Sequence, residues 1–267
     1  MIDRTRRNLS AVLGTLVLAG LLTAACGKRQ GGDERAGAPK RPPGTPKPLL
    51  DEDIAPALSR LDAWYAAHLP PNRYKFNPPA SEAQLDAFER SVGLKLPKSY
   101  RQLYRWHDGE DDDRWGHIYG LPLLSLRQAE FQWRAWERVL ASFDGDRYKI
   151  PGRGWPEGAV DPAYINPRWI PLTHDGSGNH IGLDFDPWPN GRIGQVILFG
   201  RDEDTNAVLA PSLGKFLEWI ARLLESGNFR LDAGNGGPLL RRFRLKAPQP
   251  DGFHDGARIL LGAPPAF

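Results

Sequence analysis

Apolar side chains recur at intervals of three and four residues in five stretches of the chain, and this spacing predicts amphipathic helices. Two of the stretches open with a Ser-x-x-Gln pattern, at Ser81 and at Ser125, which is typical of a helix N-terminus. The predicted helices cover about residues 51–68, 81–93, 97–109, from 125 onward, and 212–227.

The pattern changes to that of strands between residues 168 and 199. Three short runs rich in apolar residues, 168–174, 180–185 and 194–199, are separated by segments of Gly, Asp, Asn and Pro. Such runs divided by turn-forming residues predict a β-meander. Helices followed by a meander and a closing helix indicate an α+β fold in which helices pack on an antiparallel sheet.

Two further segments have weaker patterns. Residues 144–168 are rich in Gly and Pro, which predicts irregular structure. Residues 228–267 form a C-terminal extension, in which the alternation over 239–247 predicts an added edge strand.

The only cysteine of the chain, Cys26, follows an uncharged segment from Leu9 to Ala25. Arginines precede this segment, and small residues stand directly before the cysteine. We therefore predict a bacterial lipoprotein signal peptide over residues 1–25, exported by the general or the twin-arginine route, with Cys26 lipidated. The alternative is an uncleaved membrane anchor, for which about 17 residues are just long enough. In many Gram-negative bacteria an Asp directly after the lipidated cysteine keeps a lipoprotein in the inner membrane. Gly27 stands at that position, which favours the periplasmic side of the outer membrane.

Residues 26–49 hold few apolar side chains and many Gly, Pro and charged residues, which predicts a disordered tether. The chain has a formal net charge of +3, yet residues 1–50 alone contain nine Lys or Arg and three acidic residues. The rest is therefore slightly acidic, which argues against nucleic acid as the partner. The basic tether fits a position against anionic lipid headgroups.

Several motifs resemble those of a known family. A capped helix leads into Gly93, Leu96 and Pro97, and an aromatic-rich helix then ends at Asp108-Gly109. A Trp-x-Pro start, an Asp-Gly turn, a Leu-Asp strand and a Gly-x-x-Gly-x-Val strand follow over residues 168–199. Residues 50–227 are in this way similar to the SUKH superfamily, in its Smi/Knr-like branch. The resemblance implies one non-catalytic α+β domain whose partner is a toxin domain or a cell-wall assembly factor.

An acidic run follows the third predicted helix. It does not fit a calcium loop, because Gly109 is out of register and no closing Glu follows. We therefore expect Glu110, Asp111, Asp112 and Asp113 to be solvated and to contact a basic protein partner.

The segment 174–188 contains the residues most typical of a site. His180, Asp184 and Asp186 share one face of the predicted strand. A half-buried strand also has such a polar face, and no paired-histidine spacing accompanies it. We expect no metal, no cofactor and no catalysis, and we assign Asp184 and Asp186 to the partner surface. A hydrolase that uses Asp184 is the alternative.

Trp188 stands between two prolines in the turn after that strand, where a large side chain is hard to bury. We predict that it anchors the partner, whereas Trp133 and Trp136 have the spacing of core residues. The sequence thus predicts a membrane-tethered, non-catalytic protein-binding module of the cell envelope. The alternative is a glycan-binding lipoprotein in which Trp188 stacks on sugar rings.

Overall fold

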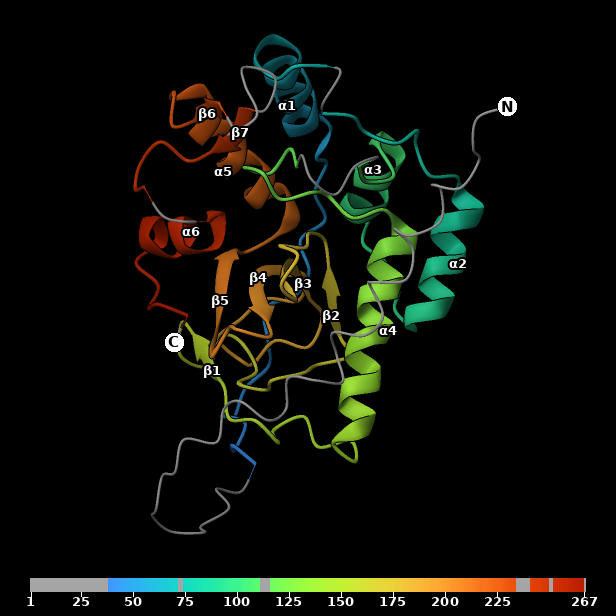
Figure 1. The fold of residues 1–267 in the computed structure, drawn as a ribbon. Coiled ribbons are helices and arrows are strands. Elements are labelled where there is room, and N and C mark those ends of the chain that lie inside the picture. Colours follow the sequence, from blue (N-terminus) through green and yellow to red (C-terminus); the bar gives the residue numbers. More distant parts are fainter. Residues whose placement is uncertain (1–37, 72–73, 111–115, 234–240, 250–251, 267) are drawn as a thin grey trace, which may run out of the picture. The chain divides into compact units, whose positions relative to one another are not determined.

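The computed structural model describes residues 38–71, 74–110, 116–233, 241–249 and 252–266 (Figure 1). The predicted signal peptide, Cys26 and the first part of the predicted tether lie outside these residues. Asp111, Asp112 and Asp113 of the predicted acidic surface also lie outside them. Residues 38–267 belong to one compact unit.

Helices form where the sequence supplies an apolar stripe together with caps. They are α1 (Ala55–His68), α2 (Glu82–Val92), α3 (Lys98–Trp106), α4 (Leu126–Ser142), α5 (Leu213–Glu225) and α6 (Phe253–Leu261). Both Ser-x-x-Gln patterns form capping boxes, at Ser81 and Ser125, as predicted. Gly93 ends α2 at a φ of 65°, which a residue without a Cβ adopts at little cost.

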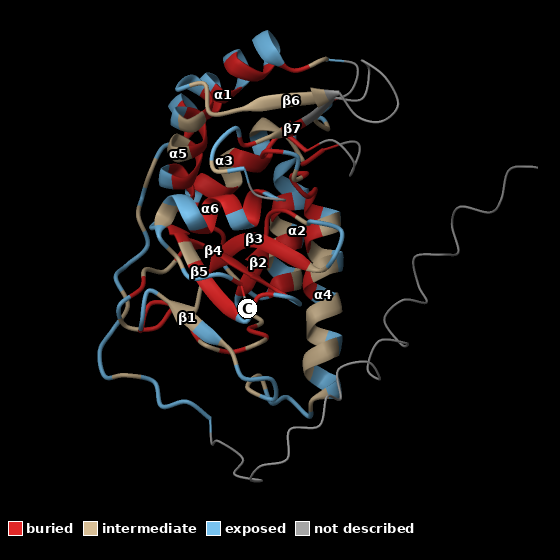
Figure 2. Ribbon diagram, turned by 60° about the vertical axis from the view of Figure 1, so that its left-hand side comes forward, coloured by how far each residue is buried: buried red, intermediate tan, exposed pale blue. Residues whose placement is uncertain are grey.

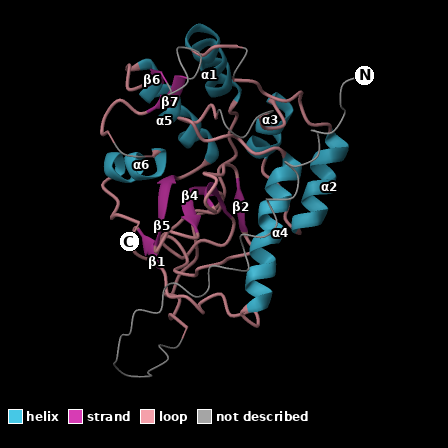
Figure 3. Cartoon of the chain, in the orientation of Figure 1, coloured by secondary structure: helices cyan, strands magenta, loops and turns pink. Residues whose placement is uncertain are grey.

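The main sheet of the described residues has the strand order β1-β5-β4-β3-β2 (Figure 1). Its strands lie between α6 and α4 in the view of Figure 3. The strands are β1 (Arg153–Trp155), β2 (Trp169–Pro171), β3 (Asn179–Asp184), β4 (Gln195–Gly200) and β5 (Thr205–Ala210). Neighbours are antiparallel except β1 and β5, which are parallel. The predicted meander is confirmed in β2 to β4. The sequence pattern did not predict β1, which has three residues in a Gly- and Pro-rich segment, or β5, which begins with polar residues.

Strands β2 to β5 of this sheet are buried almost throughout, which means that both of their faces are covered, whereas β1 is partly exposed (Figure 2). On one face, side chains such as Ile181 and Leu183 of β3 join the main core with the helices. On the other face, Val160 and Ala163 of the irregular segment form a second small core against β2 and β4. All six residues of β3 are therefore buried, and the predicted solvated face of this strand is wrong. The irregular segment lies where solvent was expected.

The described part of the C-terminal extension does not add a strand to the main sheet. β6 (Arg230–Ala233) and β7 (Arg241–Arg244) form a separate antiparallel pair. Phe243 of β7 stacks against Trp64 of α1 and Tyr119, so the aromatic core holds this strand away from the sheet edge. The helix α6, which the sequence pattern did not predict, packs on β5.

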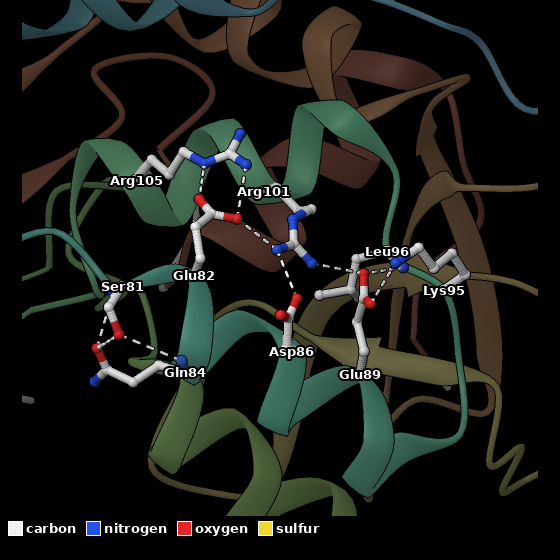
Figure 4. Close-up of polar contacts among 9 residues, drawn as sticks. All are labelled: Ser81, Glu82, Gln84, Asp86, Glu89, Lys95, Leu96, Arg101 and Arg105. Atoms are coloured by element: carbon white, nitrogen blue, oxygen red, sulfur yellow. Dashed lines mark hydrogen bonds and ion pairs between the residues drawn. The ribbon is translucent and has the colours of Figure 1, made fainter.

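A network of ion pairs joins α2 to α3 (Figure 4). The guanidinium of Arg101 contacts carboxylates of Glu82, Asp86 and Glu89 at 2.6, 2.8 and 2.9 Å. Glu89 also accepts the backbone N–H of Leu96 at 3.0 Å. The network thus fixes the Gly-x-x-Leu-Pro link between the two helices.

Candidate functional site

Glu110 is buried, with 3% of its surface exposed. Its Oε1 accepts the backbone N–H groups of His117 and Leu123 at 3.0 and 2.8 Å, and its Oε2 lies 3.2 Å from Nδ1 of His117. Burial raises the pKa of Glu110, although the contacts with His117 oppose this effect. The prediction of a solvated Glu110 is therefore wrong. This side chain holds the segment 116–123 in place.

Asp184 is also buried, with no exposed surface. One carboxylate oxygen accepts from Nε1 of Trp169 at 3.1 Å and from the backbone of Asp186 at 2.9 Å, and the other accepts from Gln195 at 2.9 Å. Burial raises the pKa of Asp184 to about 7. The prediction of Asp184 on an accessible face is thus wrong, because the irregular segment covers that face.

Asp186 is partly accessible and takes part in an ion-pair network. Arg147 lies between Asp161, at 2.9 Å, and Asp186, at 3.2 Å. Burial alone would raise the pKa of Asp186, but the hydrogen bond from Asn166 and the contacts with Arg41 and Arg147 hold it below its usual range. Asp186 therefore stays ionised and paired, and Arg147 and Asp161 are members of this cluster that the sequence pattern did not indicate.

Trp188 is 8% exposed, against the expectation of an exposed anchor. Its backbone N–H donates to the carbonyl of Ala159 at 3.2 Å, and its carbonyl accepts from Gly191 at 2.8 Å. The tight turn 187–191 folds the side chain inward, so flanking prolines did not keep it in solvent. Trp188 does not offer a free ring face to a protein or a sugar.

Residues 38–49, predicted to belong to the tether, lie along the loop 186–194. Arg41 contacts the carboxylate of Asp186 at 3.1 Å and donates to the carbonyl of Pro187 at 2.6 Å. Lys47 exchanges backbone hydrogen bonds with Gly191 and Ile193 at 2.9 and 3.0 Å. We call residues 38–49 the strap. The guanidinium of Arg41 and the backbone of Lys47 thus find partners on the domain, which composition alone could not reveal.

The buried histidine of β3 is held as a neutral ring. Nδ1 of His180 donates to the carbonyl of Thr173 at 2.8 Å, and burial lowers the pKa of His180 to about 3. His174 lies nearby, with ring centroids 5.2 Å apart. In the part of the chain that the structure describes, no group of three or more His, Cys, Asp or Glu side chains has the arrangement of a metal site.

α4 carries an exposed row of side chains that was not among the predicted site residues. It consists of Arg127, Phe131, Arg134 and Arg138, which we call the α4 stripe. The spacing of four, three and four residues places them on one side of the helix, opposite the buried Ala129 and Trp133. The spacing of these four residues can be read from the sequence, and it places them on the side of the helix opposite the apolar stripe.

The motifs that carry the resemblance lie in the α2–α3 link and in the β2–β4 meander. A family model described as the SMI1 / KNR4 family (SUKH-1) matches residues 79–219, which includes both parts. The chain belongs to the SMI1/KNR4 (SUKH-1) family. The resemblance stated from the motifs is therefore confirmed.

Relatives in the SMI1/KNR4 family include fungal regulators. The chain is 31% identical over 207 residues to "Cell wall assembly regulator SMI1" of Saccharomyces cerevisiae. The alignment covers 66% of this chain and 41% of the relative. It is 32% identical over 195 residues to the "Cell wall biosynthesis/cell cycle regulator smi1" of Schizosaccharomyces pombe. That alignment covers 68% of this chain and 38% of the relative.

A third relative is the "Glucan synthesis regulatory protein" of Neurospora crassa, with 28% identity over 232 residues, 75% of this chain and 44% of the relative. The chain thus spans less than half the length of these relatives. All three relatives are named as regulators.

The predicted membrane attachment involves residues that precede the described ones. Within the described ranges, no helix has the length and apolar character needed to cross a bilayer. Lipidation of Cys26 remains a prediction from the sequence.

Proposed function

We propose that this SMI1/KNR4-family protein is a non-catalytic regulator that binds a protein partner at the cell envelope while anchored through lipidated Cys26. The match of residues 79–219 to a family of regulators carries this proposal. The names of the relatives favour a cell-wall assembly factor over a toxin domain as the partner.

The environment of Asp184 supports a non-catalytic role. Both of its oxygens are occupied by hydrogen bonds from Trp169, Gln195 and the backbone, and the side chain is fully buried. A general acid or nucleophile must reach its substrate. The buried ring of Trp188 likewise gives no support to a sugar-stacking platform.

Cross-linking in native membranes tests the proposal. The full chain with its own signal peptide is expressed with an affinity tag, cross-linked in cells, and the captured proteins are identified by mass spectrometry. We expect one stoichiometric envelope protein that also binds the purified chain. The Cys26→Ser variant should lose the membrane fraction and, with it, most of the capture.

Two control variants make the result specific. Asp184→Asn should capture the same protein, because we assign no chemistry to Asp184. Reversal of charge at Asp111, Asp112 and Asp113 tests whether the predicted acidic surface takes part. The absence of any specific partner for the wild-type chain in both membranes and purified form would overturn the proposed function.

A further inference from the structure

The α4 stripe combines an exposed aromatic ring with arginines along one helix. Phe131 is 63% exposed, which exceeds every other large apolar side chain among the described residues. One exposed apolar residue is ordinary on a protein surface. Here the ring stands between Arg127 and Arg134 on the same side of α4, and Arg138 follows one turn beyond.

The charges of the stripe are only partly neutralised. Arg134 contacts Glu130 at 2.9 Å and Ser91 at 2.9 Å, so its guanidinium is held in a defined position. Arg127 and Arg138 have no carboxylate partner among the described residues. These two arginines are eleven residues apart, or about 16 Å along the helix axis. A strand-like segment of about five residues covers that length.

A hollow of about 360 Å³ lies beside Phe131. Pro122 and Leu124 line it together with Phe131, and the polar part of its lining includes Arg127, Gln128, Gln132 and His174. Glu110 also lines it, but Oε1 of Glu110 already accepts two backbone N–H groups. The hollow is therefore suited to an apolar side chain whose neighbours are negatively charged.

We infer that the α4 stripe is the surface that binds the partner, and that the partner presents an acidic segment with an apolar side chain. The apolar side chain would enter the hollow beside Phe131, and carboxylates would pair with Arg127 and Arg138. This inference rests on the proposed function, since it names the surface of that binding. A concave site next to an exposed ring fits a protruding side chain better than it fits a flat lipid surface.

Fluorescence anisotropy with the purified full chain tests the surface. The probes are a labelled peptide of alternating Glu and Leu and a matched peptide of alternating Gln and Leu. We expect the Glu-Leu peptide to bind at least about tenfold more tightly, with an affinity that falls as salt is added. Phe131→Ala and the double variant Arg127→Glu/Arg138→Glu should each weaken this binding by about tenfold or more.

Matched variants control for exposure and net charge. Ile259→Ala removes another exposed apolar side chain, at 60% exposure on α6, and Arg222→Glu/Lys246→Glu makes the same charge change elsewhere. Both should bind like wild type. Equal affinity for the two peptides, or no effect of the stripe variants, overturns the inference. Binding only to vesicles that contain phosphatidylglycerol, lost in the double variant, also overturns it in favour of a lipid surface.

The partner captured by cross-linking separates this inference from the proposed function. Loss of that partner in Arg127→Glu/Arg138→Glu, with normal capture by Arg222→Glu/Lys246→Glu, supports both. Full capture by the stripe variant would overturn the α4 surface and leave the proposed function standing.

Discussion

Glu110 illustrates how a single charged residue can serve the fold. Its carboxylate accepts the backbone N–H groups of His117 and Leu123, so it closes the loop that precedes α4. The ring of Phe76 stacks on His117 with centroids 3.7 Å apart and covers the pair. A buried acceptor of this kind is costly to remove, because its donors are left without partners.

We predict that Glu110→Ala lowers the free energy of unfolding by about 2–3 kcal/mol, since two backbone donors lose their acceptor. Glu110→Gln keeps an oxygen for these donors and should cost less. Urea unfolding of both variants measures the difference. If Glu110→Ala proved as stable as wild type but failed to capture the partner, Glu110 would be a contact residue after all.

Asp184 should make stability depend on pH. Its pKa is raised to about 7 in the folded state, above the ordinary carboxyl value of about 4. The protonated Asp184 therefore contributes to the free energy of unfolding. This contribution is fully present below about pH 4 and is lost as the pH rises through about 7.

Asp184→Asn removes this dependence. We expect wild type to lose at least about 1 kcal/mol relative to Asp184→Asn between pH 5 and pH 8. Urea unfolding of both proteins at the two pH values provides the test. Other buried carboxyls, such as Glu203, contribute to both curves and cancel in the comparison. A constant difference between the two proteins would show that Asp184 does not titrate in this range.

At the scale of elements, α2 and α3 are held together by Arg101. At this point three carboxylates of α2 face one guanidinium of α3. Removing the guanidinium leaves these negative charges close together.

We predict that Arg101→Ala lowers the free energy of unfolding by about 1–2 kcal/mol. Arg105→Ala is the matched control, because Arg105 has Glu82 as its one ion-pair partner among the described residues and is half exposed. Its effect should be clearly smaller. Thermal or urea unfolding of the two variants distinguishes them, and equal effects would argue against a special role for Arg101.

The strap is a second element, and one ion pair together with several hydrogen bonds holds it to the domain. Arg41→Ala removes the contacts with Asp186 and Pro187, and the backbone pairing of Lys47 with Gly191 and Ile193 should then open more often. We expect hydrogen exchange at Ile193 to become several-fold faster, with little change in global stability. Lys40→Ala, which removes a neighbouring charge, should leave this exchange unchanged. Identical exchange in both variants would mean that Arg41 does not hold the strap.

At the scale of the whole molecule, the C-terminal extension is tied to the sheet. Arg258 of α6 forms a buried ion pair with Glu203 and donates to the carbonyls of Thr205 and Pro264 at 2.6 and 3.1 Å. The helix beyond the family match is in this way joined to the start of β5. The C-terminal segment is thus part of the same core as the family domain.

We predict that Arg258→Met destabilises the protein by about 3–5 kcal/mol, because Glu203 is left buried and without its cation. The double variant Arg258→Met/Glu203→Leu should recover a large part of this loss. Urea unfolding of the single and double variants forms the test. A double variant as unstable as Arg258→Met would show that the loss arises from packing and not from the unpaired carboxylate.

The sequence by itself determined the elements whose signals are local. Capping boxes at Ser81 and Ser125, the glycine that ends α2 and the turns of the meander each depend on a few neighbouring residues. The family motifs are local in the same sense, and they predicted the α+β fold correctly.

Only the tertiary structure decided which polar residues are accessible. The irregular segment buries Asp184, the segment 116–123 encloses Glu110, and the strap lies beside Asp186. Each of these contacts joins residues far apart in the chain or depends on how a loop closes. The periodic pattern of apolar residues therefore cannot predict them. The α4 stripe shows the converse: its spacing was visible in the sequence, but its exposure depended on which face of α4 packs against the sheet.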